Sequence, residues 1–101
     1  MKPTKDLALL AERIFEIDEH GQYYKLNGEY FCWIWSWNPT ESAYQCLMVL
    51  EWLAESGCDV RIWTYKGMTQ CKIEVVHIKA WYEDEDFKTA VTLAAIEYIK
   101  Q

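Results

Sequence analysis

The sequence predicts an α+β fold, a small α/β sandwich in which helices pack on an antiparallel sheet of about three to five strands. Apolar residues recur at helical spacing in three segments, near residues 5–17, 39–56 and 87–100. Between the last two segments, residues 60–65 and 69–77 show strand-like alternation and are joined by a Lys66-Gly67 turn. An Asn27-Gly28 pair marks a further hairpin.

The first helix is predicted to begin at Lys5, with Thr4 as its cap and an apolar stripe that includes Leu10. Two alternatives remain open for its end. Gly21 can take the left-handed C′ conformation and prolong the helix to His20. Otherwise, residues 15–18 are already extended.

Residues 22–35 are predicted to form a hairpin, because Asn-Gly suits a type I′ turn. Strict alternation would place Phe31, Trp33 and Trp35 on one face of its second strand, and Tyr30, Cys32 and Ile34 on the other. A strand that is apolar on both faces is either sandwiched between layers or partly left for a partner. Such a strand could also pair with its own copy and form a homodimer.

The central helix is predicted to begin at Asn38-Pro39. Asn38 is an N-cap acceptor, Pro39 suits the first helical position, and Glu41 can reach back to the cap. Gly57 is expected to end the helix, because glycine adopts the C′ conformation without steric cost.

The two strands after this helix are expected to pair antiparallel. The pairing would place Val60, Ile62, Ile73 and Val75 against the central helix. The opposite face would carry large amphipathic side chains, namely Arg61, Trp63, Tyr65, Lys72 and Glu74.

An acidic run, Glu83-Asp84-Glu85-Asp86, directly precedes the last helix. Asp86 can cap that helix, and the positive end of the helix stabilises the other carboxylates. The run therefore has a structural explanation, and a role in binding would be a second use.

The composition limits the classes of function. The net charge is −6, which argues against direct binding to a nucleic-acid backbone but permits an acidic surface that competes with nucleic acid for a basic groove. No apolar run reaches the ~20 residues of a membrane span, and the charged start of the chain leads into no signal-peptide core. We therefore expect a single cytoplasmic domain over residues 1–101 with no membrane partner.

Metal and catalytic motifs are not evident in the sequence. The four cysteines lack the two-residue spacing of a zinc or redox motif and are interpreted as reduced thiols. His20 is interpreted as a loop residue and His77 as a structural histidine, because no nucleophile or carboxylate motif accompanies them. We expect no metal, no cofactor and no enzymatic activity.

Three stretches carry a family resemblance. They are Asp6-Leu7-Ala8-Leu9-Leu10-Ala11-Glu12-Arg13-Ile14-Phe15, Trp37-Asn38-Pro39-Thr40-Glu41 and Ala90-Val91-Thr92-Leu93-Ala94-Ala95-Ile96. They resemble the opening helix, the start of the second helix and the closing Ala-rich helix of the phage ABA-sandwich domain family. The chain departs from that family at residues 22–34, where a variable loop is expected, and at the acidic run, where Thr-x-Pro is frequent. The resemblance implies one phage ABA-sandwich-like domain in a small phage or prophage protein, and it carries over no catalytic residue.

Two functions follow as hypotheses. The first is a phage or prophage accessory protein that binds and inhibits a bacterial host protein in the host cytoplasm, as an anti-CRISPR-type inhibitor of a nucleic-acid-binding defence effector would. The alternative is a protein that binds or sequesters a small nucleotide signal, with Arg61 as cation beside the stacking faces of Trp63 and Tyr65. The predicted partner-binding residues are Arg61, Trp63, Tyr65, Glu83, Asp84, Glu85, Asp86, Trp33 and Trp35.

Overall fold

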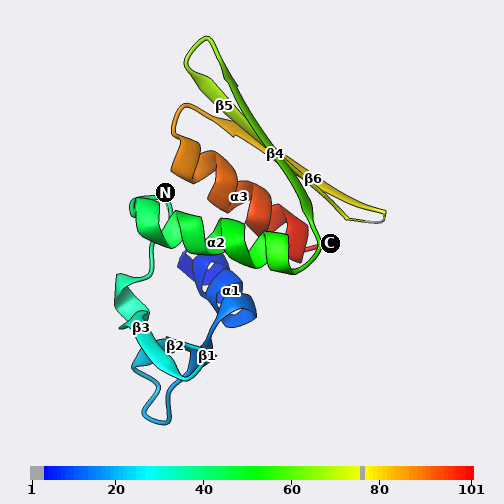
Figure 1. The fold of residues 1–101 in the computed structure, drawn as a ribbon. Helices are drawn as coiled ribbons and strands as arrows, with labels where there is room; N and C mark the ends of the chain where they lie inside the picture. Colours follow the sequence, from blue (N-terminus) through cyan, green and yellow to red (C-terminus); the bar gives the residue numbers. More distant parts are fainter. Residues whose placement is uncertain (1–3, 76) are drawn as a thin grey trace. The chain divides into compact units, whose positions relative to one another are not determined.

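The computed structural model describes residues 4–75 and 77–101. Contacts divide the chain into two compact units, Met1–Asn38 and Pro39–Gln101. Helices and antiparallel strands occur in both units, so the α+β class is confirmed (Figure 1). The strands form two separate sheets of three strands each, one in each unit, and the predicted hairpin belongs to the first sheet. The prediction of a single domain over residues 1–101 stays a prediction.

The first unit consists of one helix and one sheet. Its elements are α1 (Thr4–Ile14), β1 (Glu16–Ile17), β2 (Tyr23–Leu26), β3 (Glu29–Trp33) and the 3₁₀-helix η1 (Ile34–Ser36). The strands lie in the order β1-β2-β3 and all pairs are antiparallel.

Helix α1 ends at Ile14 and not near residue 17, so the extended alternative for residues 15–18 is correct. The reason is Asp18, whose buried carboxylate accepts hydrogen bonds from the backbone N–H groups of Gln22 (2.7 Å) and Tyr23 (3.1 Å). These bonds fold the following residues into a turn that leads into β2. Burial alone would raise the pKa of Asp18, but the N–H donors of Tyr23 and Gln22 hold it below its usual value.

The core of the first unit is an aromatic cluster around Phe15. Its ring stacks with those of Tyr24 (5.6 Å between centroids) and Phe31 (5.0 Å) and meets Trp37 edge-on (5.2 Å). The indole Nε1–H of Trp37 donates a buried 2.9 Å hydrogen bond to the carbonyl of Leu7. These contacts tie α1 to the sheet.

A β-bulge changes the predicted faces of β3. Tyr24 pairs with Cys32 but Lys25 pairs with Tyr30, so Phe31 is an extra residue without a cross-strand partner. Phe31 consequently joins the Phe15 cluster, while Tyr30 and Trp33 both lie beside Tyr23. The predicted strict alternation over residues 30–35 is therefore wrong, and η1 replaces the end of the strand.

The second unit consists of two helices and one sheet. Its elements are α2 (Ala43–Glu55), β4 (Asp59–Tyr65), β5 (Met68–Val75), β6 (Ile78–Asp84) and α3 (Phe87–Ile99). The strands lie in the order β4-β5-β6 and all pairs are antiparallel. Lys66 and Gly67, both with positive φ, form the tight turn between β4 and β5.

Helix α2 begins four residues later than predicted. Ser42 is its N-cap, because the Ser42 hydroxyl accepts a 3.2 Å hydrogen bond from the backbone N–H of Gln45. Residues 39–41 form a turn before it, so the assignment of Asn38 as cap and Pro39 as first helical residue is wrong. Both Asn and Ser are good capping residues, and the chain uses the later one.

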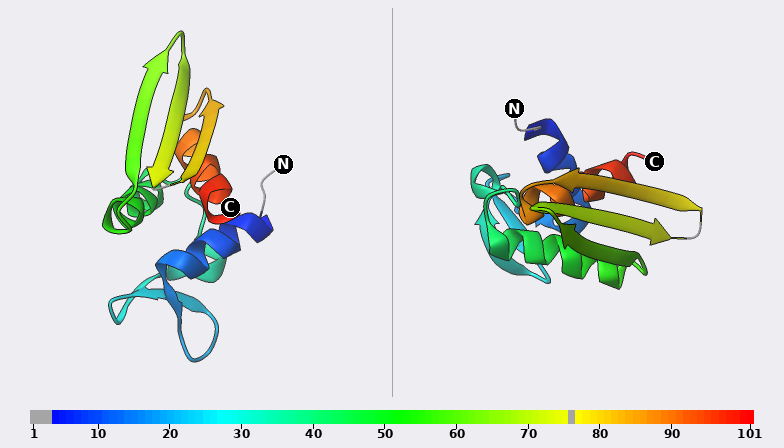
Figure 2. Two further views of the ribbon diagram at one scale, coloured as in Figure 1. Left: turned by 90° about the vertical axis from the view of Figure 1, so that its right-hand side faces the viewer. Right: turned by 90° about the horizontal axis from the view of Figure 1, so that it is seen from above.

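Helix α3, and not the central helix α2, is the main cover of the sheet. It packs on β5 and β6, whereas α2 packs on α3 and meets the sheet at β4 (Figure 2). Ala90, Ala94 and Ala95 are fully buried, and such small side chains allow close approach to the sheet. Ile73 is buried as predicted, but Ile62 is 38% exposed because it lies on the edge strand.

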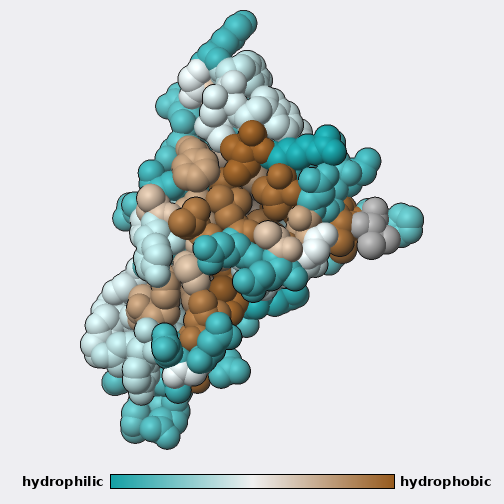
Figure 3. All heavy atoms as spheres, in the orientation of Figure 1, coloured by the Kyte–Doolittle hydropathy of each residue, from teal (hydrophilic) through white to brown (hydrophobic). Residues whose placement is uncertain are grey.

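Surface polarity differs along the second unit. Figure 3 shows apolar residues gathered over α2 and α3, whereas the tip of the β4–β5 hairpin is hydrophilic. Among residues 4–75 and 77–101, no helix combines the length and apolar character that crossing a membrane would need.

Candidate partner-binding face

The sheet of the second unit has one face that the helices leave uncovered, here named the open sheet face. Side chains alternate between the two faces of each strand, and the buried Cys71, Ile73 and Ala80 belong to the covered face. The registers place eleven side chains of the described strand residues on the open sheet face: Asp59, Arg61, Trp63, Tyr65, Met68, Gln70, Lys72, Glu74, Lys79, Trp81 and Glu83.

Two exposed tryptophans lie on the open sheet face. Trp63 on β4 is 44% exposed and Trp81 on β6 is 63% exposed. Gln70 pairs with Trp63 and Lys72 pairs with Trp81, so the two indoles lie diagonally across β5. A hollow of about 320 Å³ lies here, lined by Trp63, Gln70, Cys71, Lys72 and Trp81.

Charges on the open sheet face are balanced, although the chain as a whole is strongly acidic. Arg61 lies beside Lys72 across the strands, and each has its own carboxylate. Arg61 Nη2 is 3.2 Å from Asp59 Oδ2, and Lys72 Nζ is 2.8 Å from Glu74 Oε1. The hydrogen bond from Lys72 lowers the pKa of Glu74.

A polar bridge spans the sheet next to Trp63. The hydroxyl of Tyr65 donates a 2.8 Å hydrogen bond to Glu83 Oε2, and the amide of Gln70 donates a 2.6 Å bond to the same oxygen. Hydrogen bonds from Gln70 and Tyr65 hold the pKa of Glu83 below its ordinary value, and the same carboxylate raises the pKa of Tyr65.

The four carboxylates of the predicted acidic run have different positions and contacts in the structure. Glu83 lies on the open sheet face together with Arg61, Trp63 and Tyr65. Asp84 Oδ1 instead accepts a 2.9 Å hydrogen bond from the backbone N–H of Asp86. The carboxylate of Asp86 caps α3, accepting from the N–H of Lys88 (3.3 Å) and the hydroxyl of Thr89 (3.0 Å). Glu85 is exposed in the bend between these residues.

Trp33 and Trp35 lie in the first unit and belong to a separate aromatic row. Their rings stack with centroids 4.6 Å apart, and the Trp33 ring lies tilted against that of Tyr23, with centroids 3.7 Å apart. Tyr23 in turn contacts Tyr30 at 4.9 Å, and Lys25 Nζ lies 5.3 Å from the centroid of the Tyr30 ring. Trp35 is 70% exposed. Strand β3 is also an edge strand, so the predicted pairing of this segment with its own copy stays a prediction.

The sequence prediction missed Trp81, which is the more exposed of the two tryptophans on the open sheet face. The sequence pattern assigns no register to residues 79–82, so it does not place Trp81 on any face. A register that places Trp81 beside Lys72 would have revealed it.

In the part of the chain that the structure describes, the thiols and carboxylates form no evident metal centre. Burial raises the pKa of Cys46 to about 11 and that of Cys71 to about 12. Among residues 4–75 and 77–101, no three His, Cys, Asp or Glu side chains lie close enough to hold a metal ion.

Comparison with known proteins identifies a shared fold. No protein-family model matches the chain. No curated protein matches its sequence either. Among solved structures, a phage protein from Bacillus cereus is similar, with a TM-score of 0.64 at 19% sequence identity. The likeness covers 97% of this chain and 92% of that one, so the chain has the fold of a phage protein.

Proposed function

We propose that the chain is an accessory protein of a phage or prophage that binds a bacterial host protein through the open sheet face. The observation that carries the proposal is the pair of exposed indoles, Trp63 and Trp81, on the sheet face opposite to α3. The fold shared with the Bacillus cereus phage protein supports the phage context.

The chemistry of the face suits a protein partner. Tryptophan, tyrosine and arginine are enriched among the residues that dominate the energy of protein interfaces. Tryptophan and tyrosine bury large areas at little cost in side-chain entropy. Balanced charges around the indoles, such as Arg61 with Asp59, suit the polar rim of such an interface.

The more specific form of the proposal follows from the sequence resemblance. It is a phage ABA-sandwich-like protein that acts in the bacterial cytoplasm without catalysis, as an anti-CRISPR-type inhibitor of a defence effector. The carboxylates Glu83 and Glu85 would then approach basic groups of the effector.

The experiment that tests the proposal is affinity capture from host lysate with quantitative mass spectrometry. The wild-type chain is compared with a Trp63→Ala/Trp81→Ala variant and with a Trp35→Ala control, which removes an equally large exposed indole from the first unit. We expect the double variant to lose a specific host protein at least tenfold while the control retains it. Equal capture by all three proteins would contradict the proposal, and loss only in the control would move the interface to the aromatic row.

A small ligand is a second candidate, favoured by the hollow between the two indoles. Its volume of about 320 Å³ is at the small end of ligand pockets. Trp63 and Trp81 offer stacking faces, and Lys72 with Arg61 offers positive charge for a phosphate. A panel of cyclic nucleotides should then raise the melting temperature, because any ligand of the folded state stabilises it. An unchanged melting temperature at millimolar ligand would eliminate this candidate.

A further inference from the structure

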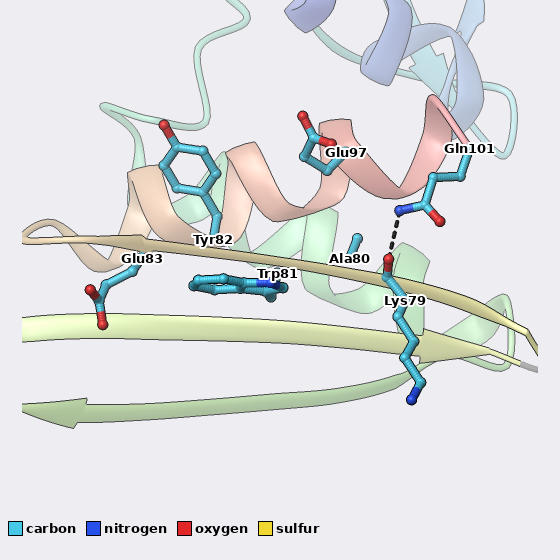
Figure 4. A pocket seen from close by; sticks show the side chains of 7 residues that line it. All are labelled: Lys79, Ala80, Trp81, Tyr82, Glu83, Glu97 and Gln101. Carbon is cyan, nitrogen blue, oxygen red and sulfur yellow. Dashed lines mark hydrogen bonds between the residues drawn. The ribbon is translucent and has the colours of Figure 1, made fainter.

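Strand β6 lies at a free edge of the sheet of the second unit. The side-chain amide of Gln101 donates a 2.6 Å hydrogen bond to the backbone carbonyl of Lys79 (Figure 4). Because this donor comes from outside the sheet, the carbonyl of Lys79 points away from β5. In an antiparallel strand both backbone groups of a residue point to the same side, and alternate residues share that side. The backbones of Lys79, Trp81 and Glu83 therefore face the free edge.

The side chains along this edge are complementary to those of a second copy that runs antiparallel to it. We propose that two copies of the chain pair antiparallel through β6, about a two-fold axis at Trp81. In this register Lys79 lies opposite Glu83 of the second copy, and the same pair recurs at the other end. On the covered face the small Ala80 lies opposite the large Tyr82, and Trp81 lies opposite its own copy.

The register also satisfies the backbone. Trp81 faces Trp81 of the second copy, and both residues present their N–H and C=O groups outward, so the two exchange a pair of hydrogen bonds. Lys79 and Glu83 face outward too and form equivalent pairs on each side. The result is one six-stranded antiparallel sheet, with Trp63 and Trp81 of both copies on its open face.

The free edge has the space and the apolar surface that such pairing needs. A hollow of about 560 Å³ lies along it, lined by Lys79, Ala80, Trp81, Tyr82, Glu83, Glu97 and Gln101. Figure 4 shows the rings of Trp81 and Tyr82 on opposite sides of β6. Trp81 is 63% exposed and Tyr82 is 38% exposed, so pairing would bury aromatic surface on both faces. Unpaired edges of this kind are ready templates for strand addition.

Gln101 acts as a competitor in the single chain. Its amide occupies the Lys79 carbonyl that the N–H of Glu83 of the second copy would otherwise reach. The exposed Gln101 side chain must swing away when the copies pair. Removing it with Gln101→Ala should therefore tighten the dimer severalfold.

The test is sedimentation equilibrium of the purified full chain over a range of concentrations. We expect a reversible monomer–dimer equilibrium. In Lys79→Glu and in Glu83→Lys, residue 79 of one copy and residue 83 of the other carry like charges at both ends of the strand pair. Each variant should therefore raise the dissociation constant of the dimer roughly tenfold. Mixing the two variants restores opposite charges at both ends, and so does combining them in one chain. Glu83→Lys also removes the bonds to Tyr65 and Gln70, but the mixture and the combined variant repair only the intermolecular contact.

A backbone variant provides an independent check. Trp81→Pro removes a donor that faces the free edge, so it should abolish pairing while sparing the ladder with β5. A matched control is Ile62→Pro on β4. The backbone groups of Arg61 and Trp63 bond inward to β5, so those of Ile62 face the other edge of the sheet. A chain that stays monomeric at ~1 mM would overturn the proposal, as would a dimer that survives Trp81→Pro or ignores the charge exchange. Because these measurements use the purified chain alone, their outcome is independent of the proposed host partner.

Discussion

The hydroxyl of Tyr65 on β4 donates a hydrogen bond to the carboxylate of Glu83 on β6, across the strand that separates them. Gln70, on the intervening β5, donates to the same carboxylate oxygen. One carboxylate thus connects all three strands on the open sheet face. The position of Glu83 is consequently fixed by its neighbours, and so is the charge that the proposed partner would meet beside Trp63.

Replacing Tyr65 by Phe should raise the pKa of Glu83 toward 4.5, its ordinary value, because one of its two donors is lost. The lowered pKa means that the bridge stabilises the fold above the unfolded-state pKa and loses this effect as the pH falls through the folded-state pKa. The raised pKa of Tyr65 gives the opposite pH dependence. The stability that its hydrogen bond contributes is present below pH 10 and is lost as the pH rises through the folded-state pKa of Tyr65. NMR titration of the Glu83 side-chain carboxyl in both proteins measures the shift. Superimposable titration curves would show that the Tyr65 bond does not form in solution.

Asp86→Ala should lower the free energy of unfolding by about 1 kcal/mol, because it removes the cap of α3. Glu85→Ala is the matched control and should change stability by less than about 0.5 kcal/mol, since Glu85 is exposed in a bend. Urea denaturation followed by circular dichroism compares the two variants. If both variants are equally stable, the acidic run does not divide into structural and surface carboxylates. Because Asp86 caps α3, reversing all four charges of the acidic run at once would change stability and binding together. Such a variant could not test binding alone.

Thr92→Val should leave stability unchanged or raise it by up to about 1 kcal/mol. The hydroxyl of Thr92 is fully buried in α3 and has no hydrogen-bond partner within the described part of the chain. Valine keeps the branched shape and removes the desolvation cost of the hydroxyl. A calorimetric melt should show a gain of up to a few degrees, and a clear loss would reveal a partner for the hydroxyl in solution.

Cys46 and Cys71 should resist alkylation in the folded chain. Both are fully buried, and their raised pKa values of about 11 and about 12 leave very little thiolate at pH 8. Cys58 is half-buried and should be modified first by iodoacetamide. Time-resolved mass spectrometry of digested protein identifies the order. Early labelling of Cys71 would mean that the sheet opens readily from α3.

Much of the second unit could be predicted from local patterns. The alternation around Lys66-Gly67 defined β4 and β5, and Asp86 was correctly identified as the cap of α3. Such features depend on neighbouring residues only, so the sequence carries them. The start of α2 marks the limit, because Asn38 and Ser42 are both suitable caps and the choice depends on how the chain enters the helix.

The candidate site could be predicted only in part, because it is assembled across strands. Arg61, Trp63 and Tyr65 share one strand, and their common face follows from period-two alternation. Placing Trp81 on this face requires the register between β5 and β6. Assigning the role of Asp84 requires the turn that brings its carboxylate to the backbone N–H of Asp86. Neither the register nor the turn has a signature in the residues that it connects.

The bulge at Phe31 has a consequence for how this strand tolerates change. Phe31 occupies no rung of the ladder, so deleting it would leave every remaining hydrogen-bonded pair of β3 with a partner. The deletion would nevertheless remove the ring that stacks on Phe15 at 5.0 Å. An insertion beside Phe31 would instead shift the register of part of β3 by one residue and move its side chains to the opposite face. Homologous chains should therefore keep an aromatic residue at the bulge, although the ladder itself does not require a residue there.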